Sequence, residues 1–311
     1  MATLIETRLR EAMAEYMDTY NRTRSDSIFA SLVLDKGADQ GFFKPAVVTL
    51  PGEPTEFTGN ATVHSQDSAS VIYETKVFEY TLGIDRNLLA KTDAISRGEV
   101  SRIIRGMANK AVGHMDKRLT TLLLTGESTG NIGGGAFFSA TVAIPGGSTL
   151  DNLVGTSVSG SAAEVLSSFR SAQAHFISMR NAGNDLVTGV IPKVGVMYDP
   201  RATNGTSIHK NVLDALNPQL ANDVSKPDAA EYMMLPNGYL SGSVADIWFF
   251  DMGAMDKAFT AGWQQRPVLE SNVGVQTDSD RLLNRRDLFQ TSWSYEVAFG
   301  SPYSAVLGND A

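Results

Sequence analysis

The sequence predicts an α+β fold, and three features of the residue pattern indicate it. A long helical periodicity covers residues 96–126, strand-like runs lie at 71–82 and in the last part of the chain, and glycine- and proline-containing stretches separate them. The chain has 311 residues, of which 42% are hydrophobic and 19% charged. It can therefore bury a sizeable core, and we expect a folded body with long connecting loops.

Residues 3–20 are expected to form an amphipathic helix that needs a partner surface. Its apolar residues recur at helical spacing with charged residues between them: Leu4, Leu9, Met13 and Met17. A polar stretch, 21–27, and a short apolar stretch, 28–34, follow. This pattern is typical of an arm that lies across the body of its own chain or across a neighbour.

Two strands joined by a long polar tip are expected between residues 44 and 82. The first strand, 44–50, ends at the breaker Pro51-Gly52-Glu53-Pro54, and residues 55–70 are polar and short of aliphatic side chains. The second strand, 71–82, is rich in β-branched and aromatic residues. An extended hairpin cannot bury its own faces and is marginal alone, so we expect it to contact a neighbour.

The strongest single element is a helix expected to begin at Ser96. Ser96 and Glu99 have the spacing of a capping box, and Gly126 is placed to end the helix. Apolar residues follow at intervals of three or four: Val100, Ile103, Met107, Ala111, Met115, Leu119 and Leu122. A helix of about 29 residues would be roughly 43 Å long. Glycines within it lower its helical propensity, so packing must stabilise it.

The rest of the chain predicts a second long helix at 161–182 and a short one at 208–216. Strand patterns are expected at 191–198, 244–250, 267–277, 287–297 and 298–307. Aromatic residues concentrate late in the chain, and a core role is the default for them, with burial between subunits as the alternative: Trp248, Phe249, Phe250, Trp263, Trp293, Tyr295, Phe299 and Tyr303.

No residue pattern indicates a metal site. The chain has no cysteine, and its four histidines, His64, His114, His175 and His209, form no HExxH or similar spacing. His114 and Asp116 lie two positions apart on the expected helix, so they point to different faces and cannot bind one ion together.

No pattern indicates catalysis or a cofactor either. The sequence has no GxSxG elbow, and Gly133-Gly134-Gly135 lacks the Lys-Ser/Thr of a phosphate loop. Acidic pairs such as Asp278 and Asp280 are interpreted as solvated turn residues. We therefore expect no catalytic residue, no cofactor and no enzymatic activity.

The charge balance argues against tight nucleic-acid binding. The net charge is -8, and the sequence has no long basic tract, Asn284-Arg285-Arg286 being the nearest approach to one. The N-terminal residues lack the pattern of a signal peptide, and no stretch approaches the length of a membrane span. We expect a protein that is made in the cytoplasm and makes no membrane contact.

Two blocks resemble the major head proteins of Mu-like phages. The run from Tyr73 to Arg86, YETKVFEYTLGIDR, is similar to the family's aromatic-acidic strand that leads to an arginine. The run from Met107 to Asp116, MANKAVGHMD, with the leucine-rich end before Gly126, is similar to the family's helix. The resemblance covers roughly residues 70–155. The family usually continues with an acidic segment ending in Asp-Thr-Asp-His-Pro, whereas residues 136–142 keep only the paired phenylalanines.

The order of elements also resembles the Hong Kong 97-type capsid fold of tailed phages. That resemblance implies an N-terminal arm (1–45), an extended loop (46–82), a peripheral domain with a long spine helix (83–150 and 266–311) and an axial domain (151–265). It further implies a shell subunit whose partners are copies of itself in hexamers and pentamers. Portal and scaffold proteins are expected as further partners. Packaged double-stranded DNA would contact the inner face non-specifically, and the protein would reside in the virion.

Candidate contact residues between subunits lie in the loop and on the long helix. We expect Glu53, Glu56 and Asp67, with the apolar Phe57, to meet basic residues on a neighbour's helix. The basic candidates are Arg97, Arg102 and Arg105. Some shells of this type are crosslinked through a lysine in the extended loop, but residues 51–70 contain no lysine. The sequence therefore predicts a shell held by noncovalent contacts.

Three other functions remain open from the sequence. An encapsulin-like nanocompartment shell has the same fold and would hold cargo enzyme instead of DNA. An unrecognised hydrolase or binding protein would be monomeric at high concentration. A tail or decoration component would be present on virions in far fewer copies. The chain begins at Met1 without a scaffold-like domain, so a separate scaffold is expected.

Overall fold

The structure of the chain is a computed structural model. The model describes residues 2–49, 67–91, 93–132, 134–144, 149–155, 159–180, 186–187, 191–217, 227–228, 230–271 and 286–309. Helices and strands are both present, so the α+β class predicted from the sequence is confirmed. Two four-stranded sheets organise the chain. One hydrophobic cluster includes residues of both sheets, and a second lies between the second sheet and its helices.

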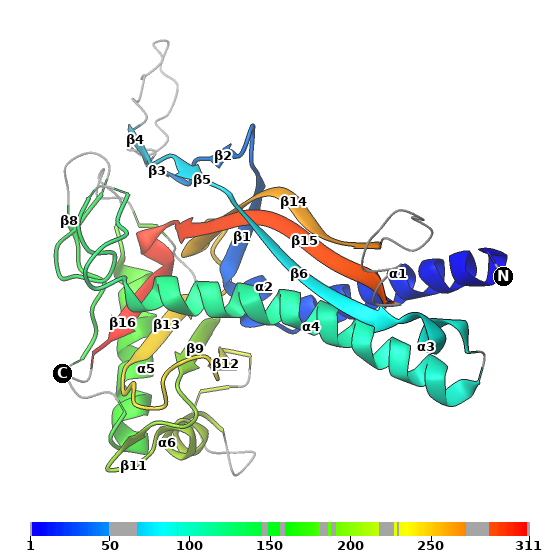
Figure 1. Cartoon of the computed structure of the whole chain (residues 1–311). Coiled ribbons are helices and arrows are strands. Elements are labelled where there is room, and N and C mark those ends of the chain that lie inside the picture. Colours follow the sequence, from blue (N-terminus) through cyan, green and yellow to red (C-terminus); the bar gives the residue numbers. More distant parts are fainter. Residues whose placement is uncertain are drawn as a thin grey trace.

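The first sheet forms the elongated half of the molecule (Figure 1). Its strand order is β1 (Val33–Gly37), β14 (Phe259–Ser271), β15 (Arg286–Phe299) and β6 (Lys76–Asp85). β1 runs parallel to β14, and the other neighbours are antiparallel. The long central pair supplies six of the thirteen buried aromatic residues of the hydrophobic cluster that lies between this sheet and the helices.

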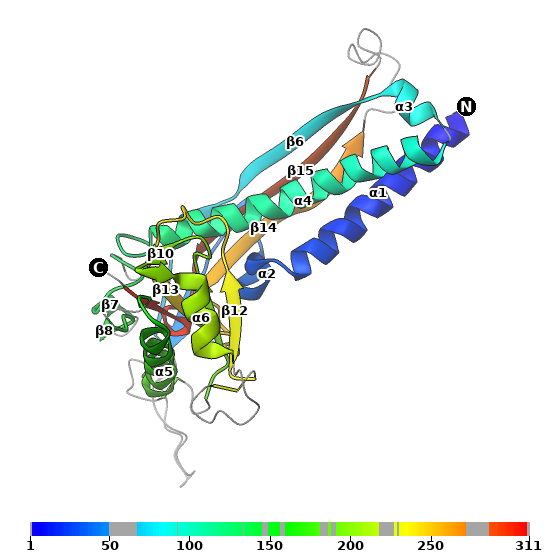
Figure 2. The ribbon, with the colours of Figure 1, turned by 90° about the horizontal axis from the view of Figure 1, so that it is seen from below.

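Two long helices lie side by side against this sheet (Figure 2). They are α1 (Ala2–Ser25) and α4 (Ala94–Leu124), and α4 has 31 residues, which corresponds to roughly 46 Å. The long helix predicted from the sequence is confirmed, but the predicted cap is wrong. The N-cap is Asp93, whose carboxylate accepts a hydrogen bond of 2.9 Å from the Ser96 N–H, and Ser96 itself lies buried in the first turn.

The apolar side of helix α1 packs against other residues of its own chain. Tyr16 and Tyr20 are buried against the sheet, and the Tyr16 hydroxyl hydrogen-bonds that of Thr291 on β15. Beyond the helix, α2 (Ile28–Leu32) leads into β1, where Asp35 pairs with Arg24. Of the two partner surfaces expected for this segment, the body of its own chain is the one that α1 and β1 contact.

The second sheet forms the other half of the molecule. Its strand order is β12 (Tyr232–Pro236), β9 (Val194–Tyr198), β13 (Ile247–Asp251) and β16 (Ala305–Gly308). Helices α5 (Ala162–Ser178) and α6 (Ile208–Leu216) pack against each other and share one hydrophobic cluster with this sheet. The helices predicted at 161–182 and 208–216 are thus confirmed, as are the strands expected at 191–198 and 244–250.

The chain crosses between the two four-stranded sheets three times, and the last two crossings lie at bounds that differ from those expected. β14 begins the return to the first sheet at Phe259, before residue 266. After β15 the short helix η1 (Pro302–Ser304) leads into β16, which pairs with β13 in the second sheet. The eight late aromatic residues are all buried, so the core role is confirmed for them.

The remaining elements are short. Helix α3 (Arg86–Ala90) follows β6, and β7 (Val142–Ala143) pairs with β8 (Thr149–Leu150). β10 (Thr203–Asn204) and β11 (Thr206–Ser207) form a tight turn before α6. Beyond the first sheet, β2 (Phe42–Phe43) pairs with β5 (Tyr73–Glu74), and β3 (Ala46–Thr49) pairs with β4 (Asp67–Ser70).

Candidate subunit interface

A projecting hairpin stands off from the first sheet (Figure 1). It consists of the pairs β2–β5 and β3–β4, so the strand predicted at 44–50 is confirmed, but its partner is 67–70, which was expected to belong to the polar tip. Most of the strand predicted at 71–82 lies outside this hairpin, in β6 of the first sheet. Phe43 and Tyr73 stack with ring centroids 5.7 Å apart, and the Thr75 N–H donates to the Gly41 carbonyl at 2.7 Å. The base of the hairpin is therefore fixed to the body.

Apolar side chains near this base face solvent. Ile72 is 59% exposed and Val77 74% exposed, and Phe42 and Val71 are exposed as well. Isolated exposed apolar residues are ordinary, but a group of them on a projecting element marks an interaction surface. Of the candidate contact residues in this loop, Glu53, Glu56 and Phe57 lie outside the described residues, and Asp67 begins β4, in register with Thr49.

The three candidate arginines lie along α4 but in different surroundings. Arg105 donates a hydrogen bond of 2.7 Å to Glu15 of α1, so this arginine already has a partner in its own chain. Arg102 is exposed on the helix. Arg97 lines a cavity between α1 and α4. The prediction that acidic residues of a neighbour meet these arginines stays a prediction, and Arg105 is the weakest candidate for it.

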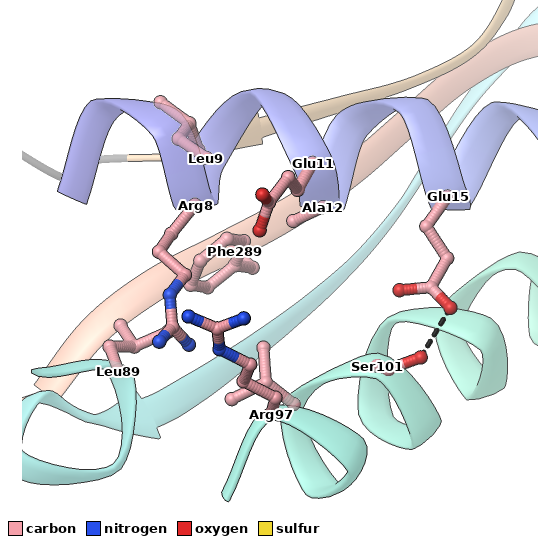
Figure 3. A pocket seen from close by; sticks show the side chains of 10 residues that line it. Arg8, Leu9, Glu11, Ala12, Glu15, Leu89, Arg97, Ser101 and Phe289 are labelled. Carbon is pink, nitrogen blue, oxygen red and sulfur yellow. Dashed lines mark hydrogen bonds between the residues drawn. The ribbon is translucent and has the colours of Figure 1, made fainter. Parts of the chain in front are cut away.

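The cavity at Arg97 has a volume of about 180 Å³ (Figure 3). Arg8 of α1 and Arg97 of α4 extend into it from opposite sides, above an apolar wall that includes Phe289. The Arg8 guanidinium donates to the Lys91 carbonyl at 2.7 Å. Glu11 and Glu15 also line the cavity, so its two positive charges lie near two negative charges of the same chain.

A larger groove runs between α4 and β6, and we call it the α4–β6 groove. Its volume is about 700 Å³, and it is open to solvent. Phe78 and Trp293 form its aromatic lining with His114, and Tyr239 closes one end from the loop between β12 and β13. Gly113 permits this approach, because a Cβ there would lie 2.5 Å from the Tyr239 hydroxyl.

Lys110 and Lys117 give the groove a positive rim. Both are exposed, and neither has an ion-pair partner among the residues that the structure describes. The groove's one carboxylate, Glu79, accepts a hydrogen bond of 2.7 Å from Gln290. No sequence motif identifies Lys110 and Lys117 as interface residues, although their seven-residue spacing places both on one face of the helix.

Two titratable groups of α4 have shifted pKa values: His114, which lines the groove, and Asp116, which lies beneath α2. Burial, followed by the charges of Arg118 and Lys117, lowers the pKa of His114, and Glu296 partly offsets this. Burial raises the pKa of Asp116 to about 6, against the effect of a hydrogen bond from the Phe29 N–H. Burial is thus the main reason why both the protonated form of His114 and the ionised form of Asp116 are disfavoured.

Within the described part of the chain, no three His, Asp or Glu side chains lie close enough together to hold a metal ion. Among the described helices, none is long and apolar enough to span a membrane.

Comparison by sequence gives no relatives: no family model matches the chain, and no curated protein matches it. Comparison by structure gives many. The capsid of cyanophage P-SCSP1u aligns with a TM-score of 0.55 and 12% identity, covering 92% of this chain and 88% of that one. A virus-like particle from Pyrococcus furiosus aligns with a TM-score of 0.52 and 10% identity, covering 97% and 98%.

The mature capsid of bacteriophage PhiM1 also aligns, with a TM-score of 0.52 and 9% identity, covering 91% of this chain and 86% of that one. At such low identities the likeness concerns the fold, and it extends over nearly the whole length of each chain. This chain therefore has the Hong Kong 97-type capsid fold.

Proposed function

We propose that this chain is the major capsid protein of a tailed bacteriophage, which self-assembles into the icosahedral head that encloses the phage DNA. The observation that carries the proposal is the fold likeness to shell-forming proteins across nearly all of both chains. The exposed apolar residues at the base of the projecting hairpin support it, because contacts with adjacent copies would cover them. The role is structural, without an enzymatic reaction.

In this proposal, the ranges have the roles that the fold resemblance implies. Residues 1–45 are the N-terminal arm, 46–82 the extended loop, and 151–265 the axial domain. Residues 83–150 and 266–311 are the peripheral domain, of which α4 is the spine helix. Strand pairing supports two adjustments to these bounds, since β14 joins the first sheet from Phe259 and β16 joins the second sheet.

The subunit's main partner is itself, in rings of five and six that use heterologous contacts. Many modest contacts to several neighbours stabilise such a shell through multivalency. Portal and scaffold proteins are further partners, and the DNA contact is non-specific because the net charge of -8 opposes phosphate binding. The protein resides in the virion. The blocks at 73–86 and 107–126 favour the Mu-like head proteins within the wider class.

A nanocompartment shell is the second candidate, and the likeness to the Pyrococcus furiosus virus-like particle favours it. The contents of particles distinguish the two functions. Particles that contain this chain, purified from cells that carry its gene and treated with nuclease, should retain double-stranded DNA. Particles that instead retain a stoichiometric protein cargo and no DNA would contradict the proposed head function and support the nanocompartment function.

A further inference from the structure

Helix α4 carries an excess of positive charge in an acidic chain. It contains six cationic and two acidic side chains, so its net charge is +4, whereas the net charge of the whole chain is -8. One of the two acids, Asp116, lies under α2, where it accepts the hydrogen bond from the Phe29 N–H. All the cations except Arg118 are exposed. The solvent face of α4 is therefore a positive surface.

Three of these cations form a row, which we call the α4 cation row: Arg102, Lys110 and Lys117. None of the three has an ion-pair partner within the described ranges of the chain, whereas Arg105 pairs with Glu15. Intervals of eight and seven residues place the three on one face of the helix, about 12 Å and about 10 Å apart along its axis. The row thus presents three uncompensated charges over roughly 22 Å.

Hydrogen-bond donors and open backbone lie between these cations. In the first interval, a Cβ at Gly106 would meet nothing within 4 Å. Asn109 lies in the same interval, and its side-chain oxygen accepts a hydrogen bond of 3.0 Å from the Thr23 hydroxyl, which leaves the amide NH₂ as a donor. In the second interval, the Tyr239 hydroxyl lies over Gly113. The row therefore offers neutral donors beside its charges, as a phosphate-binding surface does.

The composition of the row fits nucleic acid better than a protein partner. The centre of a protein interface needs apolar anchors, but the exposed large apolar side chains of α4 are Ile95 and Leu124, at its two ends. Interfaces with DNA are more polar and more positively charged. Phosphates of one strand follow each other about every 3.4 Å along a duplex, so each cation has a phosphate within reach in any register.

We propose that the α4 cation row binds the phosphate backbone of double-stranded DNA. The inference rests on the proposed function and deepens it, because it names the surface of the subunit that faces the packaged DNA. The contact is independent of sequence, since the row meets charge and no base edges. Three phosphate contacts per subunit are weak individually, and the many copies of a shell multiply them.

The other exposed cations of α4 are less suited to phosphate. Arg105 is paired with Glu15, and Arg97 lines the cavity that also contains Glu11 and Glu15. A phosphate entering that cavity would meet two like charges of the chain. Arg102 is also a candidate for contact with a neighbour's carboxylates, but that contact affects assembly of empty shells, whereas the DNA contact does not.

Crosslinking in intact particles tests the contact directly. Formaldehyde joins lysine amines to nearby DNA bases, and mass spectrometry identifies the linked residues. In particles filled with DNA, the adducts should concentrate at Lys110 and Lys117, and the exposed Lys193 and Lys210 are the matched controls. DNA-filled particles whose adducts avoid the row would overturn the proposal and leave the capsid function standing. Particles that contain no DNA would instead overturn the capsid function.

The salt dependence of DNA binding gives an independent test. Unassembled subunits are titrated with duplex DNA of mixed sequence at several salt concentrations. The slope of log affinity against log salt should be less steep by about 2–3 in R102Q/K110Q/K117Q, because each phosphate contact contributes about 0.9. The control variant, which should keep the wild-type slope, replaces three exposed lysines on other elements with glutamine: Lys44, Lys193 and Lys210.

Assembly separates DNA from an acidic protein as the partner of the row. Circular dichroism first establishes that both triple variants fold, and R102Q/K110Q/K117Q should then still form empty shells. Wild-type DNA affinity together with failure to form empty shells would assign the row to an acidic protein segment and overturn the DNA contact.

Discussion

At the scale of single residues, Asp116 has an unusual environment for a carboxyl group. It lies on α4 beneath α2, where it accepts one hydrogen bond of 2.9 Å, from the Phe29 N–H. Burial raises its pKa from 3.8 to about 6. A carboxyl whose pKa is raised on folding contributes most to stability below its unfolded pKa, and the contribution is lost as the pH rises through the folded pKa.

We predict that D116N removes this pH dependence. Between about pH 4 and pH 6, the free energy of unfolding of the wild type should lose up to about 3 kcal/mol from this group. The asparagine side chain keeps an acceptor for the Phe29 N–H and cannot ionise. Urea unfolding of both proteins at pH 4.5 and pH 7 measures the difference. Equal stability differences between variant and wild type at the two pH values would contradict the prediction.

Gly262 allows Phe43 to pack on the first sheet. A Cβ at Gly262 would lie 2.1 Å from atoms of the Phe43 ring, so G262A forces the ring to move and should destabilise the protein by about 1–3 kcal/mol. The control is G98A, where a Cβ on the exposed face of α4 meets nothing within 4 Å. That variant should be more stable by up to about 1 kcal/mol. Thermal unfolding compares them, and equal effects of the two substitutions would refute the packing role.

At the scale of elements, the start of α4 depends on Asp93. Its carboxylate accepts from Ser96, and this hydrogen bonding lowers the pKa of Asp93. The stabilisation is present above the ordinary pKa and is lost as the pH falls through the lowered value. We expect D93A to destabilise the chain at pH 7 and D93N to retain most of the cap. Hydrogen exchange at the first turn of α4 measures this, and identical protection in all three proteins would contradict the cap assignment.

The elements with strong local signals were predictable from the sequence. The apolar spacing from Val100 to Leu122 identified α4, and the runs at 161–182 and 208–216 identified α5 and α6. The cap was missed because Ser96 and Asp93 both offer an acceptor, and only the backbone conformation decides between them. Strand β1 was missed as a strand because its parallel partner β14 lies more than 200 residues away in the sequence.

The candidate site was predictable only in part. Acidic residues in the loop and basic residues on the long helix follow from composition and spacing. The sequence does not indicate which of the basic residues already have a partner in their own chain. Arg105 pairs with Glu15 only because α1 packs on α4, and this is a contact between distant segments. The groove likewise depends on Tyr239 approaching Gly113, which no local pattern indicates.

At the scale of the whole molecule, the N-terminal segment and the hairpin behave differently. α1 and β1 are packed on their own chain, where Asp35 accepts hydrogen bonds from Trp263 at 2.9 Å and Arg266 at 3.0 Å. Burial acts to raise the pKa of Asp35, but these hydrogen bonds and the neighbouring arginines outweigh it and lower the pKa. The packing of α1 and β1 therefore needs no second chain.

The absence of lysine from residues 51–70 predicts a noncovalent shell. Intact particles boiled in detergent should therefore run as single chains of about 33 kDa on denaturing gels. Hydrophobic and ionic contacts dissociate under these conditions, whereas isopeptide bonds persist. Ladders of linked subunits that resist reducing agent would contradict this prediction.

The central claim is that copies of this chain assemble into a closed shell. Electron microscopy of the purified protein at high concentration tests it most directly, with sedimentation to measure the size of the species. We predict closed particles, or rings of five and six subunits as their precursors. A compact monomer that persists at every concentration, with and without its scaffold, would contradict the claim.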